Sequence, residues 1–151
     1  MTCDPVRSSF SKSRAKFSLF MKFFVWASAL SGGSAVILGA LGAHALKERL
    51  TTTGHLEAWK TASLYHVVHA VALLAVLIAA RHAHALGDAK AVQAWKRVAI
   101  AWLAGVIFFS GSIYALSLNG PSWLGPITPL GGVILITGWL MIAWTRTPTK
   151  S

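Results

Sequence analysis

The chain has 151 residues, of which 55% are hydrophobic and only 12% are charged. A soluble domain carries about 25% charged residues, so this composition argues against an ordinary soluble protein and indicates a membrane protein whose first partner is the lipid bilayer. The net charge of +10 would suggest nucleic-acid binding in a soluble chain. However, the basic residues are not clustered with stacking aromatics, so we expect no nucleic-acid partner.

Residues 1–22 are basic and rich in serine, and we expect them to form a solvated tail. Three alternatives stay open. The first is a secretory signal, for which the apolar run 23–26 is short, and the second is a mitochondrial transit peptide, which has a similar acid-poor composition. The third is a natural start at Met21, which would leave the preceding residues untranslated. The single cysteine, Cys3, predicts neither a disulfide nor a thiolate metal site.

Four uncharged stretches follow, and each is long enough or nearly long enough to cross a bilayer, which takes about 20 helical residues. They predict an all-α, polytopic membrane protein with one domain, residues 23–145, built as a bundle of four transmembrane helices and followed by a short tail, 146–151. Thr128 as N-cap and Pro129 at the first helical position would begin the last helix. The predicted spans are 23–46, 62–80, 98–118 and 128–144.

Lysine and arginine are distributed unevenly between the two sides of this predicted topology. Eleven fall on the side of the two chain ends and the second loop, against three on the other side. The positive-inside rule therefore predicts that both termini are cytoplasmic. We expect the inner (cytoplasmic) membrane of a cell, with the mitochondrial inner membrane as the alternative. His82 and His84 are expected to be solvated side chains of the second loop.

Small residues recur every four positions in the first span, which places them on one helical face where a neighbouring backbone can approach closely. Further small residues in spans three and four predict similar helix-packing positions. The predicted packing residues are Ser31, Ala35, Gly39, Gly42, Ala43, Gly105, Gly111, Gly131 and Gly132.

Tyr65, His66 and His69 lie at the start of the second span, and residues three and four apart share a helical face. His44 lies at the outer end of the first span and Tyr114 in the third. An antiparallel pairing of spans one and two would bring His44 near His69. The sequence thus predicts a polar cluster of histidine and tyrosine in the outer half of the bilayer.

Ionisable groups inside a membrane are costly and are usually paired or functional. These histidines could form a structural hydrogen-bond network, a proton or permeation path, a metal or haem site, or a site for a lipid or quinone head group. No span contains a carboxylate or thiolate, so we expect no metal and no cofactor. No catalytic motif occurs either. We expect a non-enzymatic protein with a structural or partner-binding role, the partner being itself or another membrane protein; the alternative is a small transporter or channel component with proton-linked His44 and His69.

Four ordered motifs resemble the domain of unknown function 423 family, whose members are small four-span membrane proteins. The resemblance implies no biochemical activity, because that family's function is unknown. His66 departs from the family pattern, where glutamine can occur, which favours a hydrogen-bonding role over a metal-binding one. Residues His44, Tyr65, His69, Gly111, Ser112, Tyr114, Thr128, Pro129, Gly131 and Gly132 match the pattern. The motifs are GALGAH at 39–44, YHVVHA at 65–70, SGSIYAL at 110–116 and GPITPLGG at 125–132.

Overall fold

The computed structural model describes the backbone of residues 5–145 and the side chains of residues 14–145. This part of the chain is helical and contains no strand, which confirms the all-α prediction. The helices are α1 (Pro5–Ala43), α2 (Lys47–Thr52), α3 (Leu56–Ala85), α4 (Ala89–Val106), the π-helical segment η1 (Ile107–Gly111), α5 (Ser112–Ser117), the 3-10 turn η2 (Ser122–Leu124) and α6 (Ile127–Trp144).

Four segments are long and apolar enough to cross a membrane, as the sequence predicts. Helices α4 and α5 are joined through η1 into one of these segments, and η2 and α6 make another. Their orientation in the membrane stays a prediction. The candidate spans are Arg14–Ala43, Leu56–Ala85, Ala89–Ser117 and Ser122–Trp144.

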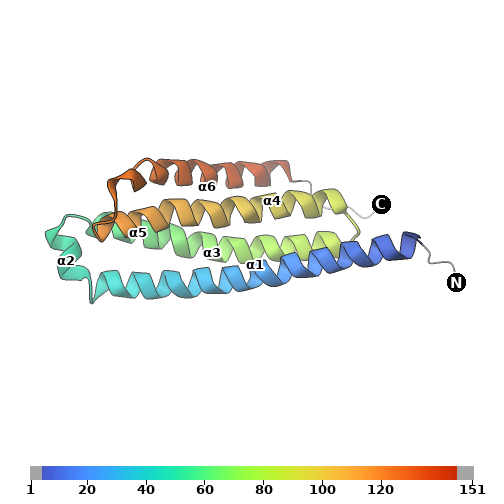
Figure 1. Cartoon of the computed structure of the whole chain (residues 1–151), viewed down its shortest axis with the longest axis horizontal. Coiled ribbons are helices and arrows are strands. Elements are labelled where there is room, and N and C mark those ends of the chain that lie inside the picture. The colour runs from blue at the N-terminus through green and yellow to red at the C-terminus, as the bar shows by residue number, and fades with distance from the viewer. Residues whose placement is uncertain (1–4, 146–151) are drawn as a thin grey trace.

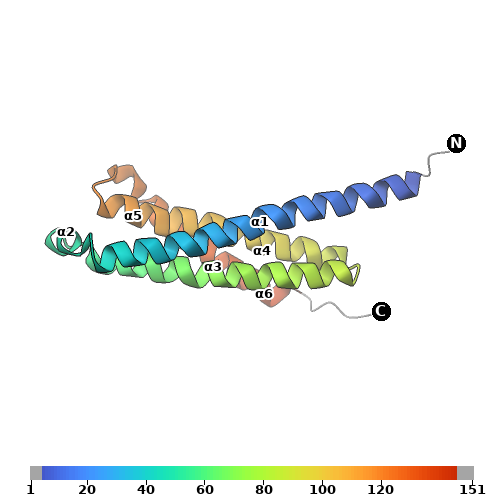
Figure 2. The same ribbon diagram turned by 90° about the horizontal axis from the view of Figure 1, so that it is seen from below.

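The long helices pack in chain order, α1 on α3, α3 on α4 and α4 on α6 (Figures 1 and 2). Figure 1 shows α1 and α6 on opposite sides of the α3–α4 pair, with α2 and the α5–α6 connection at one end and the α3–α4 turn at the other. In the most apolar window of each span, only 17% of residues are buried in α1 and α6, against 39% in α3 and 44% in α4. Helices α3 and α4 therefore form the centre of the protein, and α1 and α6 present broad outer faces.

The first helix begins much earlier than the predicted span. Helix α1 is continuous from Pro5, so residues 5–22 belong to the same helix as the predicted span and do not form a separate tail. After Pro5 the sequence has no proline or glycine until Gly32, so nothing interrupts the helical hydrogen bonds. Phe17 is buried with Ala83 and Val92, which ties this part of α1 to the α3–α4 turn. Predictions about Cys3 and about residues 146–151 lie outside the described residues.

Two further local predictions were wrong. Helix α6 begins at Ile127 with Pro126 as its cap residue, so Thr128 is inside the helix; its hydroxyl lies 2.7 Å from that of Ser112 and caps nothing. His82 and His84 belong to the last turn of α3 and not to a loop. The ring of His84 stacks on Phe17 with centroids 3.8 Å apart, which a solvated loop histidine would not do.

Candidate functional site: a histidine and tryptophan network

Hydrogen bonds from side chains of α1 and α3 cross the antiparallel seam between these two helices in a regular register. As the position in α3 advances from 59 to 66 to 70, the partner in α1 moves back from 38 to 31 to 28, as two antiparallel helices in steady contact require. The register places Ser31 of α1 opposite His66 of α3. The bonds are Trp59 Nε1 to the Leu38 carbonyl at 2.8 Å, His66 Nε2 to Ser31 Oγ at 3.1 Å, and Ser28 Oγ to the Ala70 carbonyl at 3.1 Å.

His69 lies at the centre of the protein, with only 4% of its surface exposed. Its Nδ1 lies 2.8 Å from the carbonyl oxygen of Tyr65, one turn earlier in α3, and its Nε2 receives the indole N–H of Trp139 at 3.1 Å. A carbonyl only accepts and an indole only donates, so Nδ1 carries the proton and Nε2 is the acceptor. His69 is therefore neutral in this arrangement, and both of its ring nitrogens are satisfied.

His66 faces the seam between α3 and α1, whereas His69 faces α6. Its Nε2 is bonded to Ser31, whereas its buried Nδ1 has no hydrogen-bond partner within residues 14–145. The ring lies near Tyr114, with centroids 6.1 Å apart, and the Tyr114 hydroxyl donates to Ser63 Oγ at 3.2 Å. His66 and Tyr114 thus connect α1, α3 and α5.

Tyr65 joins the network mainly through its backbone. Its side chain is 43% exposed; its ring stacks beside His69 with centroids 6.0 Å apart and lies tilted against Phe109 with centroids 5.0 Å apart. The carbonyl oxygen of Tyr65, and not its hydroxyl, binds His69.

His44 is not part of this network, so the predicted contact with His69 is wrong. It lies in the turn after α1 and is exposed. Ser31, which is opposite His66, precedes His44 by thirteen positions, or about 20 Å along a helix at 1.5 Å per residue. Antiparallel packing alone does not bring two residues together, because their distances from the shared end of the helices must also match. Here His44 is at that end and His69 is well inside the bundle.

Serine hydroxyls of the third span form hydrogen bonds to its two neighbours, α3 and α6. Ser110 Oγ donates to the carbonyl of Ala62 at 2.9 Å, and Ser112 Oγ bonds to the carbonyl of Phe109 at 2.9 Å and to the hydroxyl of Thr128. The Ser112–Thr128 pair joins α5 to the start of α6, whereas Pro129 beside it is exposed. Ser112 and Thr128, which both match the family motifs, therefore meet in space.

The predicted small-residue positions divide into two groups. A Cβ at Gly42, Gly105 or Gly131 would overlap Trp59, Leu135 or the backbone of Phe109 respectively, and Ala35 is buried, so these are true contacts. By contrast, Gly39 and Gly111 have nothing within 4 Å of such an atom, Gly132 has only ordinary contacts, and Ala43 is exposed.

Sequence reasoning missed three residues of the site: Trp102, Gly138 and the hydrogen-bonding role of Trp139. A Cβ at Gly138 would meet the Trp102 indole at 2.5 Å, and the Trp102 ring lies edge-on to His69, with centroids 5.7 Å apart. The spacing of Gly131, Leu135 and Gly138 was an available signal, since positions i, i+4 and i+7 share a helical face. These three are the buried residues of α6.

The network offers hydrogen bonding and little other chemistry. Within the described residues no group of three histidine, cysteine, aspartate or glutamate side chains could hold a metal ion. The partners of His66 and His69 are a serine, a backbone carbonyl and an indole, none of which changes charge near neutral pH. The arrangement can hold α1, α3, α5 and α6 together, but among the described residues it presents no acid–base pair.

Comparison with known proteins supports the resemblance seen in the motifs. The profile of the family described as "protein of unknown function (DUF423)" matches residues 38–132. The chain is 40% identical to the UPF0382 membrane protein YwdK of Bacillus subtilis over 124 residues, which cover 81% of this chain and 94% of that protein. It is 39% identical to the UPF0382 membrane protein SSP2132 of Staphylococcus saprophyticus, with the same coverage.

A relative also occurs in a eukaryote. The UPF0382 membrane protein C1782.12c of Schizosaccharomyces pombe is 36% identical over 121 residues, which cover 76% of this chain and 94% of that protein. No solved structure matches the chain.

Proposed function

The chain belongs to the DUF423 family of membrane proteins, and from that premise we propose that it is a non-enzymatic, multi-pass membrane protein in which His66 and His69 hold the helices together. The outer faces of α1 and α6 are then available for a partner within the membrane. The bonding of His69 is the observation that carries this proposal.

A histidine that carries protons must be able to gain one at its free nitrogen. In His69 that nitrogen is Nε2, which already accepts the indole N–H of Trp139. If Nε2 of His69 gained a proton, it and the indole N–H of Trp139 would both be donors facing each other, and the hydrogen bond would be lost in a buried site, which is costly. The geometry therefore favours a fixed, neutral imidazole over a proton-relay group.

The partner-binding part of the proposal rests on the outer faces of the protein. Large apolar residues of α1 and α6 are more than half exposed, including Val36 and Ile37 on α1 and Val133 and Ile136 on α6. Such faces are covered either by lipid or by a second membrane protein, and another copy of this chain is one such protein. Crosslinking in the native membrane from positions 37 and 133 would identify that partner; if only lipid is labelled from both helices, the partner-binding role fails.

We further propose the inner membrane of a cell, with both chain ends in the cytoplasm, and keep the mitochondrial inner membrane as the alternative. Lys90 lies in the first turn of α4, and the α3–α4 turn is at the end of the protein where α1 begins and α6 ends (Figure 1). Cysteine labelling at position 90 and at position 53, near α2, tests the orientation. Position 53 alone should react with an impermeant reagent added from outside.

Flux measurements separate the structural role from the transport alternative. Purified full-length protein in liposomes should leave proton and ion fluxes equal to those of protein-free liposomes. A flux that His69→Phe abolishes, while the helical content and thermal midpoint persist, would overturn the structural proposal. Val68→Phe is the matched control, because Val68 neighbours His69 but is exposed.

A further inference from the structure

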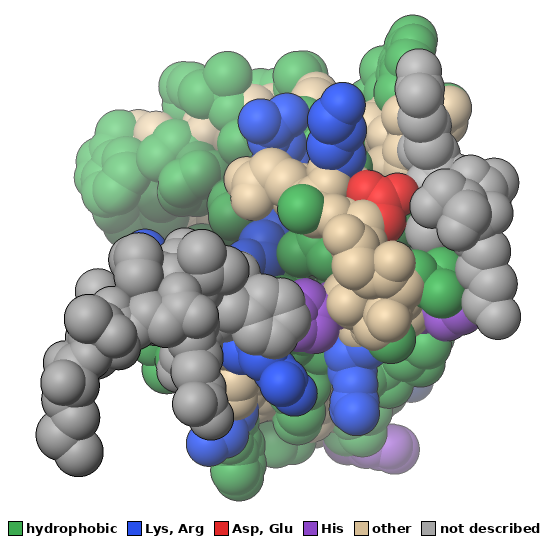
Figure 3. Space-filling model, turned by 90° about the vertical axis from the view of Figure 1, so that its right-hand side faces the viewer, with side chains coloured by type: hydrophobic (Ala, Val, Ile, Leu, Met, Phe, Trp, Pro, Cys, Tyr) green, Lys and Arg blue, Asp and Glu red, His purple; other side chains and the backbone are tan. Residues whose placement is uncertain are grey.

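The end of the protein near the α3–α4 turn is strongly basic. Figure 3 views this end and shows lysine and arginine side chains on several sides, with little acidic surface in view. Among the described acids only Asp88 lies here, and its carboxylate accepts the N–H of Ala91 at 2.9 Å as the N-cap of α4. The positive charge at this end is therefore largely uncompensated within the described residues.

A groove of about 570 Å³ lies between α1 and α3 at this end. Its floor is apolar, because Phe17 is buried and stacks on the ring of His84. Lys22 enters it from α1 and Arg81 from α3, so two cations on different helices border one hollow. The groove is lined by Phe17, Ser18, Met21, Lys22, Val25, Trp26, Arg81, His84 and Ala85.

These two cations are available to a ligand. Both side chains are exposed, and neither forms a salt bridge within residues 14–145. Lys96 is placed differently, because its ammonium lies 4.8 Å from the centre of the Phe20 ring, in a cation–π contact.

The surface in and beside the groove changes from charged to apolar along both helices. One turn further into the span from Lys22, Val25 and Trp26 are exposed, and Trp26 is 70% exposed. One turn further into the span from Arg81, Ile78 is 64% exposed on the same helical face. A free phosphate ion would use only the charged part of this surface, whereas a phospholipid would use both parts.

We propose that this groove binds an anionic phospholipid, with its phosphate between Lys22 and Arg81 and an acyl chain along Val25, Trp26 and Ile78. Basic pockets between transmembrane helices are suited to anionic head groups. Tryptophan commonly meets the head-group region of a membrane, and Trp26 follows Lys22 by one helical turn on α1.

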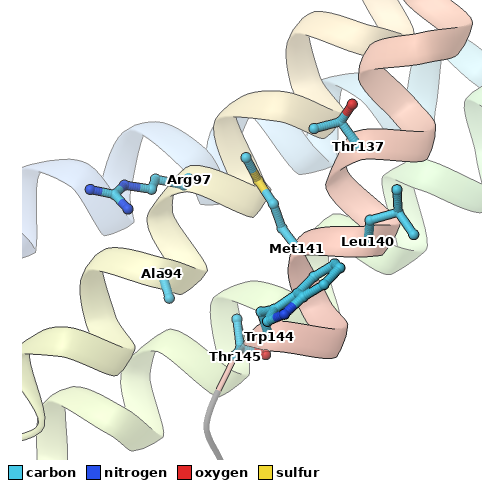
Figure 4. Close-up of a pocket in the computed structure, with 7 residues that line it drawn as sticks. All are labelled: Ala94, Arg97, Thr137, Leu140, Met141, Trp144 and Thr145. Carbon is cyan, nitrogen blue, oxygen red and sulfur yellow. The ribbon is translucent and has the colours of Figure 1, made fainter.

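A second cavity, of about 340 Å³ between α4 and α6, lacks this arrangement. It has a single cation, Arg97, whose guanidinium extends away from Leu140 and Trp144 in Figure 4. Of these two cavities, the α1–α3 groove is therefore the stronger anion site.

Native mass spectrometry of the full-length protein can test the proposal, with phosphatidylglycerol and phosphatidylcholine of identical chains as probes. We expect phosphatidylglycerol to bind more tightly. The double variant Lys22→Gln with Arg81→Gln should lose about 25-fold in affinity, at about five-fold per cation. The matched control is Lys90→Gln with Arg97→Gln, which removes the same charges at the same end but outside the groove.

Three results would overturn the proposal. Equal losses in the two double variants would mean that general surface charge attracts the lipid. Equal affinity for the two lipids would exclude an anionic site. Full displacement of phosphatidylglycerol by millimolar inorganic phosphate would mean that the acyl chain contributes nothing. The circular dichroism spectrum of each variant, which should match the parent because the replaced side chains are exposed, checks that folding is unchanged.

Discussion

Two tryptophans, Trp59 on α3 and Trp102 on α4, each pack over a glycine of a neighbouring helix. Trp59 lies against Gly42 of α1, and Trp102 lies against Gly138 of α6. Both indoles are almost completely buried, and in both pairs a methyl group on the glycine would strike the Cδ1–Nε1 edge of the ring.

The two contacts differ in what holds the indole in place. Trp59 Nε1 donates to the carbonyl of Leu38, whereas Trp102 Nε1 is buried without a hydrogen-bond partner within residues 14–145. Trp59 is therefore fixed by a directed bond and Trp102 by packing alone. Substitutions at or beside Trp59 in the α1–α3 seam should therefore destabilise the protein more than the same substitutions at or beside Trp102 in the α4–α6 seam.

The largest effect is expected where backbone meets backbone. Gly131 of α6 faces the backbone of Phe109 in η1, so Gly131→Ala forces the two segments apart. We expect a loss of about 3 kcal/mol in the free energy of unfolding, measured by denaturant titration in bicelles. Gly132→Ala is the control, because the nearest atom to its Cβ would lie 3.6 Å away, on the Phe109 side chain. Equal effects at the two positions would refute the close approach.

The two glycine–tryptophan contacts should respond unequally to the same substitution. Gly42→Ala displaces an indole that must break its hydrogen bond, so it should cost about 2 kcal/mol; Gly138→Ala displaces an unbonded indole and should cost about 1 kcal/mol. Thermal midpoints in detergent would rank the two. Gly39→Ala should have no cost, since nothing lies within 4 Å. A larger effect at Gly138 than at Gly42 would reverse the comparison.

Replacing the tryptophans themselves sharpens the same difference. Trp59→Phe removes a hydrogen bond and leaves the Leu38 carbonyl unpaired, whereas Trp102→Phe removes a donor that has no described partner. We expect Trp59→Phe to be the more destabilising by about 1 kcal/mol. Equal unfolding free energies for the two variants would show that the Trp59 bond adds nothing to packing.

The smallest effect is expected from the bond that joins α3 to α6. A double-mutant cycle with His69→Phe and Trp139→Phe should give a coupling of about 0.6 kcal/mol, the typical value for hydrogen bonds between membrane helices. His44→Ala with His69→Ala should be additive, because His44 is far along the helix axis. Additive effects in the first cycle would mean that the His69–Trp139 hydrogen bond does not contribute to stability.

Much of the site followed from local pattern. The spacing predicted that Tyr65, His66 and His69 share a helix face; in the structure His66, His69 and Tyr114 are each buried, whereas the Tyr65 side chain is 43% exposed. The partners of the histidines were not predictable, because Ser31 and Trp139 are distant in sequence. Their placement depends on helix register and rotation, which the spacing of residues within one helix does not define. The same limit explains why His44 was wrongly placed beside His69.

The sequence by itself determined four apolar helices and the concentration of basic residues on one side. It could do so because length, hydropathy and charge act locally on each segment. Tertiary structure alone decided which glycines touch a neighbour, as Gly42 does and Gly39 does not, and which tryptophan binds His69. These outcomes depend on how far one helix is turned and shifted against the next. Small residues permit several such arrangements, and the packing of the whole protein selects one of them.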